Sequence, residues 1–226
     1  MNAHPPLASS ASAAPALAPA VGLDTVLVLV AHPALAQSVV NKQLLRAAGA
    51  CGAPVEVRDL YALYPDYLID VAAEQTCLQR ARLVVWQHPI QWYHMPALMK
   101  LWVDEVLTDG WAYGAGGAAL HGKDLWLVAS TGGPADSYHP QSYNRYAFEA
   151  FLPAYEQTAA LCGMRFLPPM VLHDARRVQP EDLAIHQARY VERLRHHPAW
   201  PEIQSPDLNA GLRALPASAR AALGAG

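Results

Sequence analysis

Cysteine is scarce in this 226-residue chain, and its three cysteines, Cys51, Cys77 and Cys162, contain no C-x-x-C pair. An odd number of thiols without metal-ligand spacing argues against a disulfide framework and against a structural zinc site. Free thiols are typical of a reducing compartment, so we expect a cytoplasmic protein.

Charge is scarce as well. Asp, Glu, Lys and Arg make up 15% of the residues, and the net charge is −3 with histidine neutral. A protein that binds nucleic acid through its phosphates needs a basic stripe, which this balance does not provide. No apolar run comes near the roughly 20 residues that span a bilayer. The hydrophobic content of 53% still supplies a sizeable core.

Two phosphate-binding fingerprints are also missing. The chain has neither G-x-G-x-x-G after its first apolar run nor G-x-x-x-x-G-K-[ST], which argues against a Rossmann dehydrogenase and a P-loop NTPase. Both ends are rich in Ala and Pro. We expect tails over residues 1–22 and 201–226, flanking one domain over residues 23–200.

Between the ends, apolar runs typical of buried strands alternate with segments of helical period. The predicted strands are 25–31, 55–60, 82–87, 123–129 and 165–172, and the predicted helices are 38–50, 71–80, one opened by Pro96, 146–162 and 181–196. Such alternation indicates an α/β fold with a parallel sheet covered by helices on both faces. At this size, a flavodoxin-like three-layer sandwich with strand order 2-1-3-4-5 is the leading prediction. Its ligands bind beyond the carboxyl ends of the strands.

The loop after the first strand leads into a helix N-terminus, where free N–H groups and the helix dipole favour a phosphate. Ser38 is a candidate N-cap and phosphate ligand, Asn41 falls in the first turn, and His32 lies at the mouth of the strand. Ordinary capping by Ser38 and a buried His32 remain the alternative.

Two more loops follow central strands. The third strand runs into Ile90, Gln91, Trp92 and Tyr93, an aromatic segment between prolines that suits a flat amphipathic ring. The fourth runs into Ser130, Thr131, Gly132 and Gly133, where the glycines allow the backbone to approach a ligand closely. An aromatic plug and a plain tight turn are the respective alternatives. The Gly-rich stretch 110–122 is long enough to cover a substrate or to join a dimer face, or it is a surface loop.

The segments AHPALAQSVVN, WQHPIQWYHMPALMKLWVDEVL, GWAYGAGGAALHGK and STGG resemble the flavodoxin-like NAD(P)H:quinone oxidoreductases. Within that family the chain is most similar to the ancillary subunits of glutathione-gated potassium-efflux systems. The resemblance covers roughly residues 25 to 197.

The resemblance implies a bound flavin, FMN or alternatively FAD. Its phosphate end would be held by His32, Ser38, Val39, Val40 and Asn41, its ring by Ile90, Gln91, Trp92 and Tyr93, and its polar edge by Ser130, Thr131, Gly132 and Gly133. It also implies a homodimer, with a membrane potassium-efflux antiporter as partner on the inner face of the cell membrane. Larger quinone reductases use a Tyr and a His after this Gly-Gly loop, and here Tyr138 and the adjacent His139 are the candidate proton donors.

The resulting hypothesis is two-electron reduction of quinones by NAD(P)H, with both ligands using one slot in turn, which gives ping-pong kinetics. A regulatory subunit, in which the flavin is structural or sensing, is the alternative. An electron carrier of the flavodoxin type is disfavoured, because such carriers are usually strongly acidic.

Overall fold

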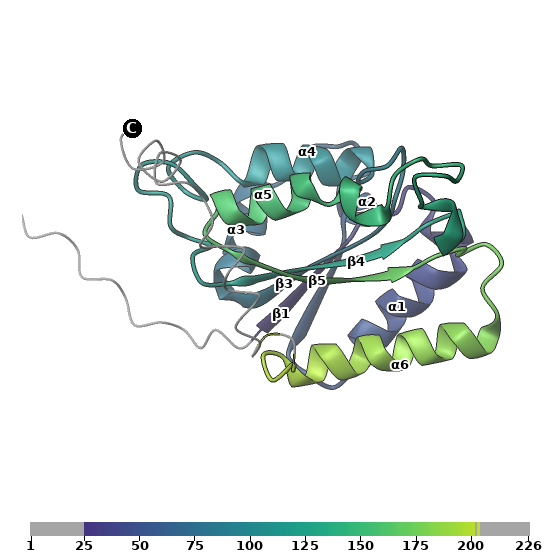
Figure 1. Ribbon diagram of the computed structural model, residues 1–226. Helices are drawn as coiled ribbons and strands as arrows, with labels where there is room; N and C mark the ends of the chain where they lie inside the picture. Colours follow the sequence, from purple (N-terminus) through teal and green to yellow (C-terminus); the bar gives the residue numbers. More distant parts are fainter. Residues whose placement is uncertain (1–24, 202, 204–226) are drawn as a thin grey trace, which may run out of the picture.

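The computed structural model describes residues 25–201 and 203, so the predicted tail over 1–22 and most of 201–226 lie outside the described residues. Five parallel strands form one sheet in the order β2-β1-β3-β4-β5 (Figure 1). The strands are β1 (Thr25–Val30), β2 (Val55–Asp59), β3 (Ala81–Pro89), β4 (Asp124–Ser130) and β5 (Arg165–Leu172). The predicted flavodoxin-like fold and strand order are confirmed.

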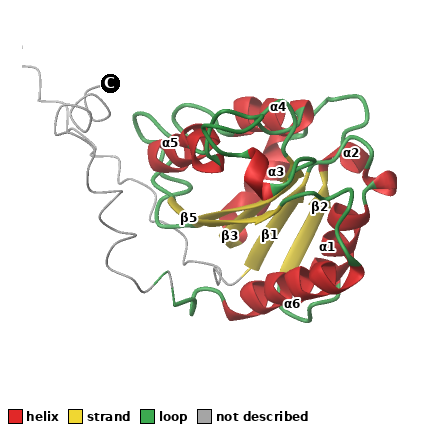
Figure 2. Ribbon diagram, turned by 45° about the vertical axis from the view of Figure 1, so that its right-hand side comes forward, coloured by secondary structure: helices red, strands yellow, loops and turns green. Residues whose placement is uncertain are grey.

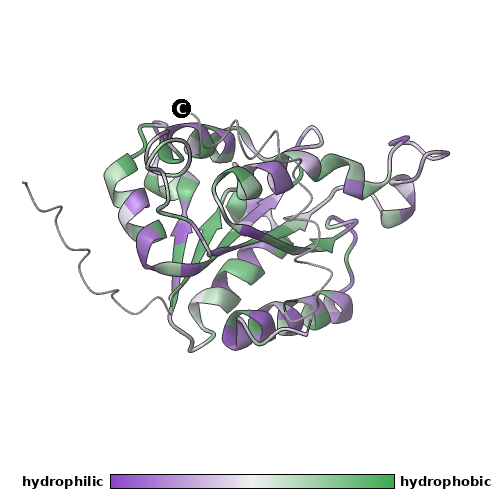
Figure 3. Cartoon of the chain, turned by 60° about the vertical axis from the view of Figure 1, so that its left-hand side comes forward, coloured by the Kyte–Doolittle hydropathy of each residue, from purple (hydrophilic) through white to green (hydrophobic). Residues whose placement is uncertain are grey.

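Helices cover both faces of this sheet (Figures 1 and 2). One face carries α2 (Leu60–Leu63), α3 (Val71–Arg80), α4 (Ala97–Val106) and α5 (Pro153–Leu161), and the other carries α1 (Val39–Gly49) and α6 (Pro180–His196). In Figure 3, α6 at the bottom of the view has both hydrophilic and hydrophobic parts, as expected for a helix with one buried face.

Two cores follow from the alternation of side chains along buried strands. Along β1, Leu27 and Leu29 enter the core under α3, α4 and α5, while Val26, Val28 and Val30 enter the core above α1 and α6. All five are no more than 5% exposed. A continuous apolar run therefore marks a central strand, as the sequence predicted.

The predicted helix over residues 146–162 is wrong in its first half. The α-helix begins only at Pro153, after a separate 3-10 turn over Phe148–Phe151. Proline lacks the N–H that an interior helical position donates and collides with the preceding turn, so it is tolerated at the first position. Pro153 was therefore a helix start that the apolar spacing concealed.

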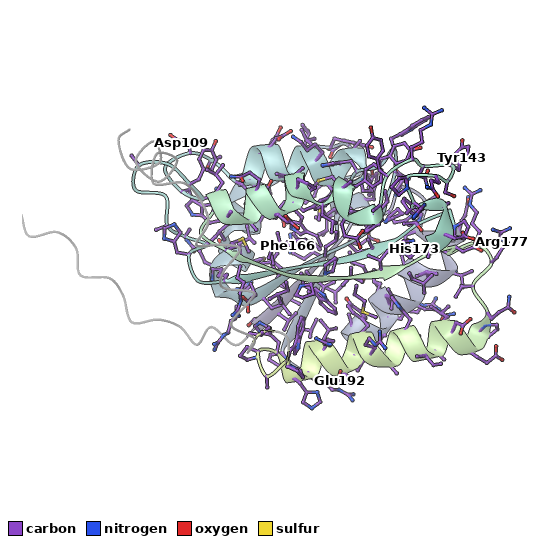
Figure 4. All side chains as sticks on the ribbon, viewed as in Figure 1. Asp109, Tyr143, Phe166, His173, Arg177 and Glu192 are labelled. Carbon is purple, nitrogen blue, oxygen red and sulfur yellow. The ribbon has the colours of Figure 1, made fainter. Side chains whose placement is uncertain are left out.

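The Gly-rich stretch 110–122 does not cover the carboxyl edge of its own sheet. It runs from α4 to the start of β4, the opposite edge, and Figure 4 shows Asp109 at the far end of the molecule from His173. Backbone hydrogen bonds from Gly110 to Tyr113 and from Ala119 to Trp111 hold it as a compact loop. Its place in a dimer face stays a prediction.

A buried carboxylate links the helix layer to the edge strand β2. Glu74 on α3 is fully buried, and its oxygens accept hydrogen bonds from Arg58 Nε at 2.9 Å, Tyr64 Oη at 2.5 Å and Trp102 Nε1 at 2.9 Å. Burial and the neighbouring Glu74 raise the pKa of Tyr64 to about 12. Because every donor converges on one carboxylate, removing it leaves several buried polar groups unpaired.

We therefore predict that Glu74→Ala lowers the free energy of unfolding by about 3–5 kcal/mol, since breaking a buried ion pair leaves an uncompensated charge. Urea denaturation measures this. Glu105→Ala, at an exposed position on α4, is the matched control and should change stability by less than about 0.5 kcal/mol. Equal losses of stability in the two variants would show that the buried cluster stabilises the fold no more than an exposed glutamate does.

Candidate functional site

A cavity of about 510 Å³ lies at the carboxyl edge of the sheet, where the loops after β1, β3, β4 and β5 meet. Its lining comes from all four loops: His32, Ala34, Gln37, Ser38, Val39, Asn41, Pro89, Ile90, Gln91, Ser130, Thr131, Gly132, Ala175 and Arg176. The structure thus brings together parts of all three loops singled out in the sequence.

The N-terminus of α1 opens onto this cavity. Ser38 is the N-cap, and its hydroxyl accepts a hydrogen bond from the backbone N–H of Asn41 at 3.1 Å. Val39 and Val40 begin the helix, where backbone N–H groups have no intrahelical acceptor. This is the arrangement that favours an anion. Val40 is not part of the cavity lining and its side chain is buried under the sheet, so its contact with a cofactor stays a prediction.

Asn41 connects this helix end to the rest of the sheet edge. Its side-chain amide donates to Ser38 Oγ at 3.3 Å and to Ser130 Oγ at 2.9 Å. Its backbone carbonyl accepts from Gln87 Nε2 at 3.0 Å, and Gln87 in turn accepts from Tyr190 Oη at 3.0 Å. Asn41 is 2% exposed, so its principal role in this structure is to fix the loops rather than to reach solvent.

His32 lies half-buried at the cavity wall. Its Nδ1 accepts a hydrogen bond from the backbone N–H of Ala34 at 3.0 Å. Burial lowers the pKa of His32 below its ordinary 6.5, with its own backbone and Asp59 opposing the shift. A neutral ring that accepts at Nδ1 carries its proton on Nε2, so His32 offers a donor.

The aromatic loop is a strained turn. Gln91 and His94 exchange two backbone hydrogen bonds, of 2.8 and 3.0 Å, around Trp92 and Tyr93, which have φ values of 48° and 63°. Two positive φ angles are the pattern of a type I′ turn, usually Asn-Gly, and cost other residues about 1–2 kcal/mol each. The turn exposes 94% of Trp92, and Tyr93 stacks on Phe151 with centroids 5.2 Å apart.

Neither aromatic side chain lines the cavity; the loop meets it through Pro89, Ile90 and Gln91. The Ile90 N–H donates to the Ser130 carbonyl at 2.7 Å, which joins this loop to the end of β4. Pro89 belongs to β3, which begins one residue earlier and ends two residues later than predicted. Contact of Trp92 and Tyr93 with a flavin stays a prediction.

The glycines after β4 differ from each other. A Cβ on Gly132 would meet nothing within 4 Å, and Gly132 has no left-handed φ, so neither backbone nor packing requires glycine there. A Cβ on Gly133 would lie 2.9 Å from Ser137 Oγ. Gly132 is the cavity residue of the two, which fits the need for close ligand approach.

The two candidate proton donors lie outside the cavity lining. Tyr138 packs edge-on against Phe148 and Phe151, with centroids 5.4 and 6.2 Å away. His139 is exposed, and its Nδ1 accepts from the backbone N–H of Gln141 at 3.3 Å. Their catalytic role stays a prediction.

The fourth loop of the cavity was not predicted from the sequence. Ala175 and Arg176, after β5, complete the cavity wall, and Gln37 adds to it from the 3-10 turn before α1. Ligands bind at the carboxyl ends of parallel strands, and β5 is one of these strands. The HDARR segment that follows β5 could therefore have been identified as part of the site.

We predict that Asn41→Ala lowers the free energy of unfolding by about 1–3 kcal/mol, because the buried Ser130 hydroxyl loses its donor. Thermal or urea unfolding checks this. Gln43→Ala, two residues along the same helix and partly exposed, should stay within about 0.5 kcal/mol. An Asn41→Ala protein as stable as the native chain would show that the Asn41 hydrogen bonds do not stabilise this edge of the sheet.

Known proteins match this chain over the described domain. The model of the Flavodoxin_2 family, with a flavodoxin-like fold, matches residues 24–196. The glutathione-regulated potassium-efflux system ancillary protein KefF of Salmonella dublin is 46% identical over 178 residues, 79% of this chain and 98% of the relative.

Solved structures agree. The general stress protein 14 of Treponema denticola, in complex with FMN, superposes with a TM-score of 0.70 at 37% identity, covering 75% of this chain and 97% of that one. A NADPH-quinone reductase from P. pentosaceus gives 0.69 at 26% identity, covering 76% and 98%. The chain belongs to the Flavodoxin_2 family and is related to the ancillary proteins of glutathione-regulated potassium-efflux systems.

Proposed function

We propose that this protein is a flavin-dependent NAD(P)H:quinone oxidoreductase that holds FMN in the cavity at the carboxyl edge of its sheet. The observation that carries this is the convergence of a helix N-terminus and three strand-end loops on one cavity of about 510 Å³. A second line of support is the family, which includes relatives named for an FMN complex and for NADPH-quinone reduction.

The donor set fits FMN. Ser38, the N–H groups that begin α1, and His32 Nε2 offer uncharged donors for a phosphate monoester. Ile90 and Gln91 on one side and Thr131 and Gly132 on the other offer backbone groups and apolar surface for a flat ring. FAD would place a second phosphate and an adenosine beyond the α1 terminus, and it is the alternative cofactor.

Bound FMN would supply hydride chemistry, while the chain supplies position and exclusion of water. A flavin ring held in this cavity would meet NAD(P)H and then the quinone in the same slot. Sharing one slot in turn would give ping-pong kinetics. The Ser130-to-Ile90 hydrogen bond and the Asn41 contacts keep the loops fixed while ligands exchange.

A second function is favoured by the 46% identity to proteins named as ancillary to a potassium-efflux system. In that role the protein would bind a membrane antiporter from the cytoplasmic side. Among the described residues no helix is long and apolar enough to cross a bilayer. Both functions are compatible with one flavin site and one homodimer.

The direct test is titration of the protein with FMN, followed by anaerobic NADPH and then a quinone, in native protein and Gly132→Ala. Native protein should bind FMN, bleach its visible bands with NADPH and recover them with quinone. Because a Cβ at residue 132 meets only open space, Gly132→Ala should fold normally yet bind FMN about tenfold more weakly, a loss of about 1.4 kcal/mol.

Gly49→Ala is the matched control, since a Cβ there also meets nothing within 4 Å and Gly49 is not part of the cavity lining. It should leave FMN affinity unchanged. Native protein that binds neither FMN nor FAD, or that stays bleached with every quinone offered, would overturn the oxidoreductase and favour the ancillary role alone.

A further inference from the structure

A hydrogen bond connects the cofactor cavity with the other side of β5. Thr131, on the cavity wall, has its Oγ1 3.0 Å from His173 Nδ1. The Thr131 hydroxyl also donates to the Gly133 carbonyl at 2.8 Å. With its proton used there, Thr131 Oγ1 accepts from His173, which places the ring proton on Nδ1 and leaves Nε2 as an acceptor.

His173 itself does not line the cofactor cavity. It comes directly after β5 and lines two other cavities, of about 650 and 350 Å³, which run along the β5 edge toward α6. Figure 4 shows its side chain at the same end of the molecule as Tyr143 and Arg177. The Thr131–His173 pair is therefore a hydrogen-bonded connection between the site and two water-accessible spaces.

Tyr138 completes the group. Its ring lies 5.3 Å from the His173 ring, and Phe148 packs edge-on against both. Burial raises the pKa of Tyr138, and the neighbouring Thr131 side chain opposes that shift. Thr131 and Tyr138, from the connection after β4, thus lie close to His173, which follows β5, whereas His139 is exposed.

We propose that His173 is a positioning residue that holds the Thr131 hydroxyl and passes solvent protons through it toward Tyr138 and the quinone. This inference rests on the proposed oxidoreductase function. It assigns to β5 a role that the spacing after the Gly-Gly loop does not reveal, since His173 lies 40 residues after Gly133.

The reaction requires one proton from solvent: quinone plus NAD(P)H plus H⁺ gives hydroquinone plus NAD(P)⁺. The carbon of NAD(P)H loses a hydride, so it is oxidised, and the quinone gains two electrons. The Tyr138 O–H gives its proton to a quinone oxygen, and the Thr131 hydroxyl turns from the Gly133 carbonyl to replace it. Nε2 of His173 first takes a proton from water in the β5-edge cavities, and the charged ring then reprotonates Thr131 from Nδ1. The neutral ring left behind carries its proton on Nε2, and exchange with water returns that proton to Nδ1.

Burial and nearby charges together determine the pKa of His173. Burial lowers the pKa of His173 below its ordinary 6.5, and Glu149 opposes the shift. Besides Tyr138, the cavities it lines bring Glu149 and Glu156 from one side and Asp174, Arg177, Asp182, His186, Arg189 and Arg193 from the other. A ring that delivers protons in its charged form loses that form as the pH rises, so the quinone half-reaction should slow as the pH rises through this pKa.

The test compares native protein with His173→Asn, whose amide still donates to Thr131 but cannot titrate. Stopped-flow of the quinone half-reaction from pH 5 to 8 should show a rate about 10²-fold lower and a flat pH profile for His173→Asn. Added imidazole should restore part of the rate. FMN affinity should change less than about threefold, and His196→Asn, a surface histidine at the end of α6, should behave as native.

A second readout needs no flavin. In ¹⁵N spectra of the imidazole nitrogens, His173 should carry its proton on Nδ1 at neutral pH, and Thr131→Val should abolish that preference. A His173→Asn protein with native rate and native pH profile overturns the inference while leaving the oxidoreductase standing, and so does loss of the profile in His139→Asn instead. Native protein without quinone turnover overturns the proposed function itself.

Discussion

The buried side chain of Asn41 is the contact on which the rest of the site depends. Through Ser38 it fixes the N-terminus of α1, and through Ser130 it fixes the end of β4, while the backbone carbonyl of Asn41 accepts a hydrogen bond from Gln87 of β3. Gln87 then reaches Tyr190 on α6. One polar chain thus ties the helix, two strand ends and the covering helix at the edge where ligands bind, and each member is satisfied by the next.

These hydrogen bonds hold the sheet edge in place, and strained backbone lies next to it. The aromatic turn keeps two consecutive non-glycine residues, Trp92 and Tyr93, at positive φ. Just before it, His88 is fully buried, and burial lowers its pKa to about 4, so the ring is neutral where it stacks on Tyr155 with centroids 5.8 Å apart. Strained and buried polar groups of this kind persist only where the surrounding structure determines them, and they cluster at functional sites.

The fold was predictable because a central strand that is buried on both faces consists of a continuous run of apolar residues. The runs that became β1 and β4 need no knowledge of their neighbours. The three loops were predictable for a related reason, since parallel strands bring their carboxyl ends to one edge. Ser38 as an N-cap required only its own position before an apolar run.

The remaining features depend on contacts between residues that are far apart in the sequence. Pro153 was hidden inside a helical spacing. The position of His173 beside Tyr138, 35 residues earlier in the chain, depends on the pairing of β5 with β4. Arg176 belongs to a loop whose sequence has no phosphate fingerprint. Likewise, the left-handed turn at Trp92 directs its side chain to solvent. The residue types in that turn do not predict a positive φ, so the sequence did not reveal this.

The central claim is that the edge organised by Asn41 is a flavin site, and a crystal structure of the protein grown with FMN tests it most directly. The account predicts the FMN phosphate against Ser38 and the first N–H groups of α1, with the ring between the Ile90–Gln91 segment and Thr131–Gly132. FMN bound elsewhere, or a cavity filled only by solvent at saturating FMN, would contradict it.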